Sequence, residues 1–465
     1  MTTLAMSSQN NCDCTNAGHC RRYRRVMTDR EIQLCQTRED YRRIFAQTAP
    51  PPGLGDVVET VIHAVGGHYL AKAWSHWTGK PCGCDERREK LNQLGRDLMG
   101  EQRIKVAFLT PSLGMGGAER VMLAQARYWP RFGVDVSAFW LHDSGPAWAP
   151  FLTELAEMNV PVHASTRRRE RGIVAADTMV DALRSALAGA DVAISWGLPD
   201  AGDLLDAAGW CGRHVLVAHG PGEWARRQMT QAAPSASHFV AVSTAAVEAF
   251  PPEAHGMTHV LWNGAETSRL TVQVDRDEQR RRWGVRPDQT VIGYIGRFSF
   301  DKHPEIVARA VMAMPEQYVA VMIGDGVEAK PITQLAREIA GDRVIIPGAT
   351  DDVGSALNAL DVWMMASKSE GFSIALTEAM LAGVPIVTNR VGAVDDLQDE
   401  HGALFTTLGP EPDELELRSA IYHALSPSGR SIADHARRVA LEHLTAELSA
   451  QRWAEWLREI CPVAV

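Results

Sequence analysis

Short apolar runs alternate with amphipathic segments from Arg103 to the end of the chain. The first run, Val106–Thr110, is followed by a glycine turn and then by helically spaced apolar residues that begin near Gly117. Further apolar runs follow in the segments DVSAFWL, ADVAISW, HVLVAHG and SHFVAVS. Such alternation is typical of a parallel sheet with helices on its faces.

A second set of apolar runs begins after the charged stretch DRDEQRRRWGVRPD. Its predicted strands lie in VIGYIGR, YVAVMIGDG, RVIIPG, VWMMAS and PIVTN, and its predicted helices include HPEIVARAVMAM and ITQLAREIA. The pattern therefore predicts an α/β protein with two doubly wound domains, residues 103–270 and 285–440. Residues 441–465 contain a helix with a Trp-rich face, which we expect to dock across the domains.

Residues 369–389, SEGFSIALTEAMLAGVPIVTN, predict a loop, a helix and a buried strand. Ser373 is a suitable N-cap, an apolar segment follows, and Gly383 lies where helices commonly end. Glu370 then precedes the positive end of the helix and Glu378 lies inside it. Free N–H groups at such an end favour an anion, which suggests a ligand with phosphate and hydroxyl groups. The alternative is that both carboxylates are solvated surface groups.

Length and composition restrict the class of protein. The 465 residues suffice for about three domains, and 45% hydrophobic with 7% aromatic residues is a globular composition. No stretch approaches the ~18 apolar residues of a membrane span, and the N-terminus lacks a basic region followed by an apolar core. We therefore expect no membrane span, no secretory signal and a cytoplasmic location. The sequence does not determine the oligomeric state.

The net charge of −10 is unevenly distributed. Residues 1–100 contain 14 Lys/Arg and 11 Asp/Glu, a net charge of +3, so the remaining residues carry −13. An acidic body argues weakly against non-specific nucleic-acid binding, whereas the basic N-terminal segment leaves local binding open.

Glycine-rich and charged motifs follow predicted strands in both sets, where open α/β sheets bind their ligands. Over residues 103–460 this ordered set resembles the retaining glycosyltransferase family 4, whose fold is GT-B. The resemblance rests on Gly116-Gly117-Ala118-Glu119, His219-Gly220, Asn263-Gly264, Gly296-Arg297 with Lys302, Gly324-Asp325-Gly326, and the pair Glu370 and Glu378. It implies a nucleotide-diphosphate sugar donor, with a UDP-sugar favoured, and no required divalent metal in the active site.

The donor's chemistry fits these residue types. A guanidinium fork at Arg297 and a mobile ammonium at Lys302 suit a diphosphate whose charge grows as the glycosidic bond breaks. The resemblance implies that Glu370 contacts the donor sugar, that Glu378 contacts the ribose hydroxyls and that His219 contacts the reacting sugar. The predicted catalytic residues are thus Glu370, His219, Arg297 and Lys302, and the predicted donor-binding residues are Gly116, Gly117, Arg297, Lys302, Gly371, Phe372, Ser373 and Glu378. The alternatives are a surface pair for the two cations, a helix-start turn for Gly116 and Gly117, and a structural histidine.

Six of the eight cysteines lie in the first 84 residues, which favours metal binding in a cytosolic chain. Four of Cys14, Cys20, Cys35, Cys82 and Cys84 are the predicted ligands. Because no Cys-x2-Cys pair is present, a four-iron iron–sulfur cluster is favoured over zinc, and free reduced cysteines are the remaining alternative. The stretch from Gly53-Leu54-Gly55-Asp56 to Cys82-Gly83-Cys84, and the Cys-x5-Cys spacing of Cys14 and Cys20, resemble a module of phage-encoded proteins, some of them linked to glycosylation of modified DNA bases. The segment departs from that module at Arg38, where a further cysteine is usual, so the fourth ligand is expected from Cys82 or Cys84.

Two arginine clusters suggest a nucleic-acid acceptor. Residues 21–43 carry a net charge of +4, and a basic loop lies at 167–171. The predicted phosphate contacts are Arg21, Arg22, Arg24, Arg25, Arg167, Arg168 and Arg169, with a solvated face as the alternative. The leading hypothesis is transfer to 5-hydroxymethylcytosine in DNA, in the host-cell cytoplasm if the chain is phage-encoded. Lipopolysaccharide or another glycan is the alternative acceptor, and a catalytically inactive nucleic-acid-binding GT-B protein is a third reading.

Overall fold

The computed structural model describes residues 103–114, 116–143, 147–165 and 172–461, and the backbone of residues 19–20 and 25–26. The chain divides into a unit spanning Ile104–Pro462 and a second unit made of Met1–Arg103 and Val463–Val465. In the second unit the described elements are β1 (His19–Cys20) and β2 (Arg25–Val26), which pair antiparallel. The larger unit carries every other described element.

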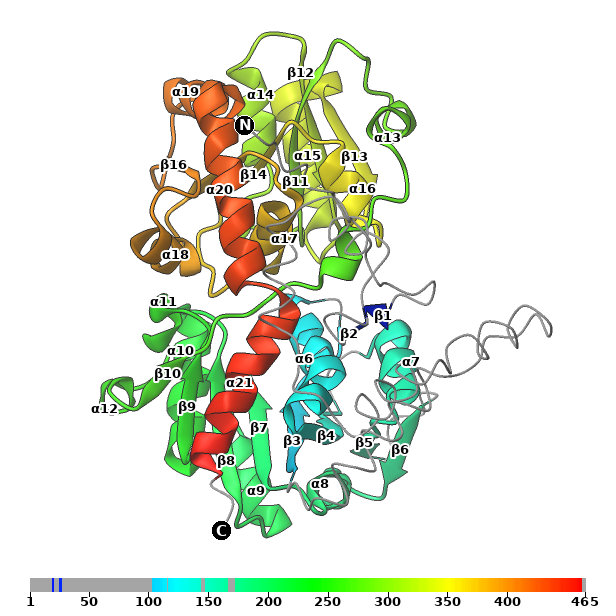
Figure 1. The fold of residues 1–465 in the computed structure, drawn as a ribbon, viewed down its shortest axis with the longest axis vertical. Helices are drawn as coiled ribbons and strands as arrows, with labels where there is room; N and C mark the ends of the chain where they lie inside the picture. Colours follow the sequence, from blue (N-terminus) through cyan, green and yellow to red (C-terminus); the bar gives the residue numbers. More distant parts are fainter. Residues whose placement is uncertain are drawn as a thin grey trace, which may run out of the picture. The chain divides into compact units, whose positions relative to one another are not determined.

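The first sheet of the larger unit has eight strands in the order β10-β9-β8-β7-β3-β4-β5-β6, and every pair is parallel. Helices follow its strands and pack on the sheet (Figure 1). The strands are β3 (Ile104–Thr110), β4 (Val134–Leu141), β5 (Val162–Ser165), β6 (Ile173–Ala176), β7 (Val192–Trp196), β8 (Arg213–Ala218), β9 (His238–Ala241) and β10 (Thr258–Val260). The helices are α6 (Gly117–Tyr128), η1 (Trp129–Phe132), α7 (Ala149–Glu157), α8 (Met179–Leu187), α9 (Ala201–Ala208), α10 (Glu223–Ala232), η2 (Ala233–Ser235), α11 (Thr244–Val247) and α12 (Pro252–His255).

The second sheet has six parallel strands in the order β13-β12-β11-β14-β15-β16. Its strands are β11 (Thr290–Ile295), β12 (Tyr318–Ile323), β13 (Val344–Gly348), β14 (Val362–Met365), β15 (Ile386–Asn389) and β16 (Thr406–Leu408). Its helices are α13 (Arg276–Arg282), α14 (Ile306–Met312), α15 (Ala329–Ala340), η4 (Gly341–Arg343), α16 (Val353–Asn358), α17 (Ile374–Ala382), α18 (Ala393–His401), α19 (Glu414–Leu425) and α20 (Pro427–His443). The expected parallel sheets with helices are confirmed, although β5, β6, β10 and β16 are short strands that the sequence patterns did not predict.

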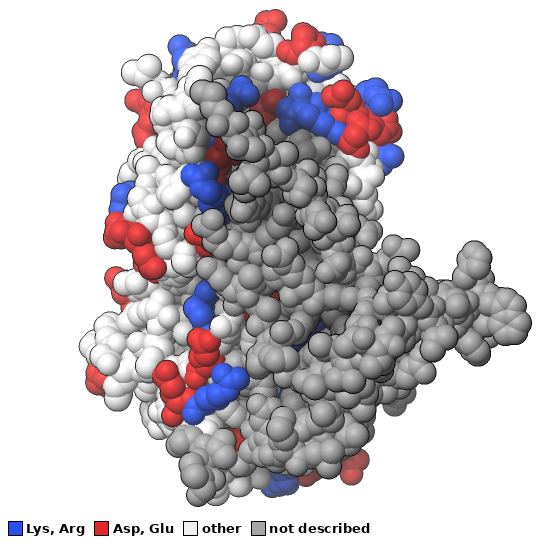
Figure 2. Space-filling view, in the orientation of Figure 1, with Lys and Arg blue, Asp and Glu red and all other residues white. Residues whose placement is uncertain are grey.

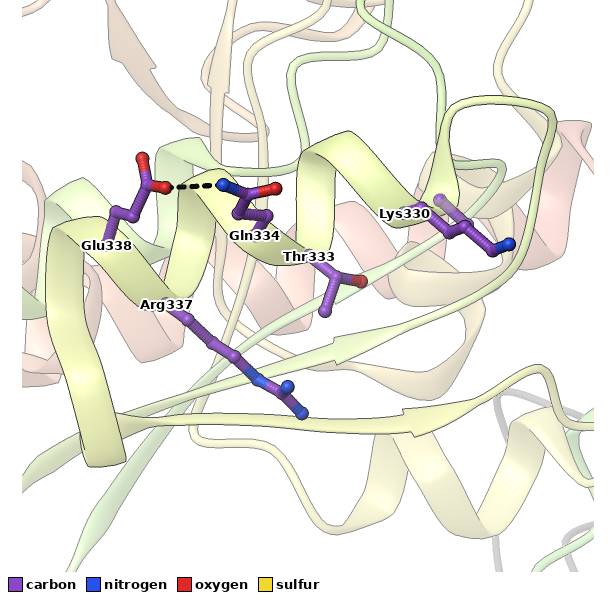
Figure 3. A pocket seen from close by; sticks show the side chains of 6 residues that line it. Lys330, Thr333, Gln334, Arg337 and Glu338 are labelled. Atoms are coloured by element: carbon purple, nitrogen blue, oxygen red, sulfur yellow. Dashed lines mark hydrogen bonds between the residues drawn. The ribbon is translucent and has the colours of Figure 1, made fainter.

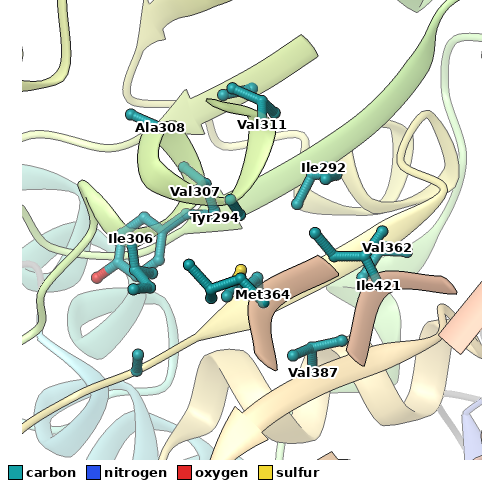
Figure 4. Close-up of a cluster of buried hydrophobic side chains, with 14 of the residues drawn as sticks. Ile292, Tyr294, Ile306, Val307, Ala308, Val311, Val362, Met364, Val387 and Ile421 are labelled. Atoms are coloured by element: carbon teal, nitrogen blue, oxygen red, sulfur yellow. The ribbon is translucent and has the colours of Figure 1, made fainter. Parts of the chain in front are cut away.

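The strands are apolar on both faces because helices cover both faces of each sheet. Figure 4 shows one face of the second sheet, where Ile292 and Tyr294 of β11 and Val362 and Met364 of β14 meet the buried side chains of α14. In the first sheet the ring of Phe108 stacks on Trp129, with 5.4 Å between centroids. These cores hold the strand ends, and the loops that leave them, in fixed positions.

Helix α17 forms as its sequence predicts. The Ser373 hydroxyl accepts a hydrogen bond from the Leu376 N–H at 3.3 Å, which caps the first turn. Gly383 ends the helix in the left-handed region at φ 74°, a conformation that glycine adopts without steric cost. Because the helix is buried among its neighbours, its apolar residues are not confined to one side.

The chain crosses from the first sheet to the second and later returns, and the two crossing segments lie side by side. The Ala265 N–H donates to the Leu444 carbonyl at 2.9 Å, and the Ala446 N–H donates to the Ala265 carbonyl at 2.9 Å. After this point α21 (Ala446–Ile460) packs on α6 and η1 beside the first sheet, where Trp453 lies 6.2 Å from the Trp129 ring (Figure 1). None of the described helices is long and apolar enough to cross a membrane.

Candidate active site

The motif-bearing loops follow strands that are neighbours in each sheet. In the second sheet, β12, β11 and β14 are adjacent, and they lead into Gly324, Gly296 and the loop that contains Glu370. In the first sheet, β8, β7 and β3 are adjacent, and β8 leads directly to His219. Carboxyl ends of parallel strands share one sheet edge, so each sheet gathers its predicted site residues on one side.

Lys302 and Glu370 form an ion pair, with 2.9 Å between Nζ and Oε2. The Lys302 ammonium also donates to the Ser369 carbonyl at 3.2 Å, and the Ser367 hydroxyl donates to Glu370 Oε1 at 2.8 Å. Asn389 in turn donates to the Ser367 carbonyl at 2.8 Å. The Glu370 carboxylate is therefore held from both oxygens, with a cation placed beside it.

Arg297 follows Gly296 directly after β11, and its side chain is exposed. Its charge acts on Glu119 of α6, which belongs to the first sheet's layer. Burial raises the pKa of Glu119, while hydrogen bonds from its own N–H and from Ser112, and the charge of Arg297, act in the opposite direction. The Ser112 hydroxyl donates to Glu119 Oε1 at 3.1 Å. A carboxylate from one domain thus lies in the field of the predicted phosphate-binding arginine of the other.

His219 has an unusual environment for a polar ring. Its ring centroid lies 4.2 Å from that of Trp196, and burial lowers its pKa to about 4. Its Nε2 is buried and has no hydrogen-bond partner within the described ranges. The imidazole is therefore neutral near pH 7 and keeps one ring nitrogen for a hydrogen bond to a ligand.

Backbone from the layers of the two sheets approaches closely at Gly371. A Cβ on Gly371 would overlap the carbonyl oxygen of His219, so only glycine fits there. Gly220 lies on the same side of this approach, but a Cβ on it would be in ordinary contact, 3.4 Å from the Gly371 nitrogen. Gly117 faces Ile374 of α17, whose Cγ1 would lie 3.3 Å from an added Cβ. The predicted loops of the two domains are therefore brought together.

The Glu119 carboxylate occupies the space beside Gly116 in the glycine loop. A Cβ on Gly116 would overlap Glu119 Oε2, so the carboxylate lies over the N-cap residue of α6. Gly116 offers no side chain for capping, and Glu119 at the third helical position supplies an acceptor there instead. An anion that approached this helix end would meet that carboxylate first.

Around the start of α17, the predicted donor-binding residues have different exposures. Phe372 is buried and Ser373 is partly exposed. The Ser373 hydroxyl already occupies the Leu376 N–H, so a ligand at this helix end has the earlier N–H groups available.

Glu378 is buried within α17, with 5% of its surface exposed. Its Oε1 accepts a hydrogen bond from Arg269 Nε at 2.9 Å. Arg269 belongs to η3 (Thr267–Leu270), a turn in the segment that joins the two sheets. A second arginine, Arg120 of α6, also interacts electrostatically with Glu378.

Glu119 and Arg269 are candidate site residues that the sequence did not single out as such. Glu119 belongs to the motif Gly116-Gly117-Ala118-Glu119. Its position three residues after the N-cap is one at which a glutamate commonly contacts the start of a helix, and this could have identified it as a site residue. Arg269 lies more than a hundred residues before Glu378, and no local pattern links them.

The N-terminal predictions lie outside the described residues. This applies to the side chains of Cys14, Cys20, Cys35, Cys82 and Cys84 and to those of Arg21, Arg22, Arg24 and Arg25. It also applies to Arg167, Arg168 and Arg169. Among the residues that the structure does describe, no group of three or more His, Cys, Asp or Glu is placed to hold a metal ion.

Two surface features lie apart from these residues. A hollow runs along α15, lined by Lys330, Thr333, Gln334 and Arg337 among others, and no predicted site residue lines it (Figure 3). On the face shown in Figure 2, described Lys and Arg side chains are interspersed with Asp and Glu rather than gathered in one stripe.

Two family models match this chain on adjoining stretches. The model described as Glycosyltransferase Family 4 matches residues 115–269, and the one described as Glycosyl transferases group 1 matches residues 275–421. A D-inositol 3-phosphate glycosyltransferase from Corynebacterium kroppenstedtii is 28% identical over 221 residues, which cover 44% of this chain and 47% of the relative. The chain thus spans about half the length of that curated relative.

Two solved structures share the fold. Anabaena Alr3699/HepE, in complex with UDP and glucose, superposes with a TM-score of 0.65 at 23% identity, covering 77% of this chain and 100% of that one. WaaG, a glycosyltransferase involved in lipopolysaccharide biosynthesis, superposes with a TM-score of 0.53 at 14% identity, covering 76% and 99%. At these identities the likeness concerns the fold, which is GT-B.

Proposed function

We propose that this chain is a glycosyltransferase of the group 1 and family 4 type, and that it moves a sugar from a UDP-sugar to a hydroxyl of a glycan acceptor. The observation that carries the proposal is the Lys302–Glu370 pair. It places a cation and a carboxylate together in the loops that follow the adjacent strands β11 and β14, where a sugar diphosphate needs both.

The donor would be held by residues of the second sheet. Arg297 and Lys302 bind the diphosphate, and Glu370 accepts hydrogen bonds from sugar hydroxyls. The ribose hydroxyls bind Glu378, and the neutral His219 offers its free Nε2 to the reacting sugar from the other domain. A bound HepE structure with UDP and glucose supports a uridine nucleotide as donor.

The reaction would retain configuration at the anomeric carbon. The bond between this carbon and the β-phosphate oxygen breaks, and its electron pair remains on the phosphate. The acceptor oxygen forms its bond to the anomeric carbon on the same face, and its proton passes to the leaving phosphate. Arg297 and Lys302 stabilise the charge that grows on that phosphate, which is where electrostatic catalysis contributes most.

A glycan acceptor is favoured over DNA. One relative is named a D-inositol 3-phosphate glycosyltransferase, and WaaG is described as involved in lipopolysaccharide biosynthesis. Both descriptions support lipopolysaccharide or another glycan rather than DNA as the acceptor. The DNA hypothesis depends on arginines outside the described ranges. The mixed charges visible in Figure 2 give it no added support.

The test is a turnover assay with the purified full chain. UDP release is measured with UDP-glucose, UDP-galactose and UDP-N-acetylglucosamine, each with lipopolysaccharide core oligosaccharide or hydroxymethylcytosine DNA as acceptor. We expect acceptor-dependent UDP release with the oligosaccharide, and mass spectrometry should find one added hexose or N-acetylhexosamine, according to the donor. Modification of the DNA alone would reverse the acceptor assignment. UDP release that neither acceptor increases would argue against both acceptors.

A further inference from the structure

We infer that Arg269 is a positioning residue for the ribose of the donor nucleotide, an inference that rests on the proposed function. It acts through Glu378, because its Nε donates to Glu378 Oε1 at 2.9 Å. The segment that joins the two sheets thereby becomes part of the donor site.

Burial of the Arg269–Glu378 ion pair holds the Glu378 carboxylate in one orientation. The side chains of Arg269 and Glu378 are 17% and 7% exposed, so water competes weakly for either charge. The guanidinium holds Oε1, and within the described residues Oε2 accepts no hydrogen bond. A carboxylate fixed at one oxygen presents the other in a defined direction, as binding of two neighbouring hydroxyls requires.

The segment around Arg269 is itself attached firmly. The Ser355 hydroxyl of α16 accepts hydrogen bonds from the N–H groups of Gln273 and Val274, both at 2.9 Å. Gly354 packs against the backbone of Leu270, where a Cβ would lie 2.5 Å from the carbonyl carbon. Arg269 therefore extends from a segment whose backbone is fixed to the second sheet's layer.

The first sheet's layer holds the same turn from the other side. Glu266, at the N-cap of η3, forms an ion pair with Arg127 of α6, and that arginine also pairs with Glu154 at 2.6 Å. Helix α6 begins at the glycine loop, so the loop, the joining segment and Glu378 are connected through charged contacts. A merely structural ion pair would stabilise this junction without affecting which nucleotide binds.

The test compares two ligands by calorimetric titration of the full chain. UDP carries both ribose hydroxyls, whereas 2′,3′-dideoxy-UDP lacks them and keeps the base and the diphosphate. We expect wild type to prefer UDP by about tenfold, the effect of losing hydrogen bonds to a carboxylate. Arg269→Met should weaken UDP binding about tenfold and change dideoxy-UDP binding less than about twofold.

Two further variants keep the test decisive. Arg269→Lys keeps the charge without the planar fork, so it should fold even if Arg269→Met does not, and it should lose part of the preference. Arg280→Met is the matched control, because Arg280 is also a partly buried arginine, 2.7 Å from Asp361, at the opposite end of β14. The Arg280→Met variant should prefer UDP over dideoxy-UDP by the same factor as wild type.

The outcomes separate this inference from the proposed function. Equal weakening of both ligands by both Arg269 variants would make the pair structural and overturn the inference. An unchanged preference would overturn it as well, while leaving the donor assignment intact. Wild type that binds neither ligand would remove the proposed function, and wild type that binds both equally would remove the ribose role of Glu378 together with that of Arg269.

Discussion

Lys302 Nζ lies 2.9 Å from Glu370 Oε2, and the two residues follow β11 and β14, which are neighbours in the second sheet. Each charge neutralises the other while no ligand is bound. A sugar diphosphate offers phosphate oxygens to the ammonium and hydroxyls to the carboxylate, so it can satisfy both groups at once. On the proposed donor assignment, the two members of this pair should act as a unit.

Glu370→Gln and Lys302→Met should each lower turnover by about 100-fold or more, because groups aimed at the transition state typically contribute about 2–4 kcal/mol. The double variant should be little worse than either single one, since residues that act together are not additive. Steady-state kinetics of the three proteins, with Arg280→Met as the control, would check this. Near-normal turnover in either single variant would contradict the assignment.

The sequence predicted those parts of the molecule whose cause is local. Ser373 caps α17 and Gly383 ends it, because a hydroxyl, an apolar run and a glycine are adjacent in the chain. Buried strands such as β11 were evident because parallel strands are apolar throughout. The short strands β5 and β10 were missed, since four or fewer residues carry too little periodicity.

The contacts that complete the candidate site depend on the tertiary fold. Arg269 and Glu378 are 109 positions apart, and only the folded chain brings them together. Glu119 was visible as part of a glycine motif, but its approach to Arg297 depends on how two domains meet. The low pKa of His219 likewise follows from burial beside Trp196, which sequence spacing does not reveal.

Gly371→Ala should reduce turnover by about 100-fold. The added methyl group would overlap the carbonyl oxygen of His219, and a displacement of about 1 Å at a reacting centre can cost that much. Gly256→Ala is the control, because Gly256 has an ordinary backbone conformation and open space around it. Activity and melting temperature of both variants would be measured. Full activity in Gly371→Ala would show that the two loops are not held together during turnover.

The free energy of unfolding should decrease as the pH is lowered, because of a buried histidine away from the site. Burial lowers the pKa of His214 to about 4, and its Nε2 lies 2.7 Å from the Ser195 hydroxyl. The unfolded chain binds a proton near pH 6.5 and the folded chain does not, so stability is lost as pH falls below about 6.5. Between pH 7 and pH 5 this one group should contribute a loss of about 2 kcal/mol.

Urea unfolding of wild type and of His214→Gln at pH 7 and pH 5 would measure that loss. The variant should lose less stability between the two pH values than wild type does, even if it is less stable at both. An identical loss in the two proteins would mean that His214 is not the group responsible.

A metal in the N-terminal segment remains a prediction from the cysteines alone. Anaerobically purified protein should be brown, with iron and sulfide bound to four of Cys14, Cys20, Cys35, Cys82 and Cys84. Colourless protein with one zinc per chain would favour the alternative ion. Protein free of both metals would end the prediction. Chelation should lower the stability of the segment without removing UDP binding, because the predicted donor residues lie after residue 103.

Glu119→Gln should bind UDP more tightly than wild type. The carboxylate lies over Gly116 and in the field of Arg297, so a bound diphosphate has to share that arginine with a like charge. Removing one charge while keeping the shape and the Ser112 contact should raise UDP affinity about two- to fivefold, the effect of one partly screened interaction. Glu455→Gln, on the exposed side of α21, makes the same change in net charge and should leave the affinity unchanged. Calorimetric titration of the three proteins would decide the matter. Weaker UDP binding in Glu119→Gln would show instead that the carboxylate is needed to hold the glycine loop in its binding conformation.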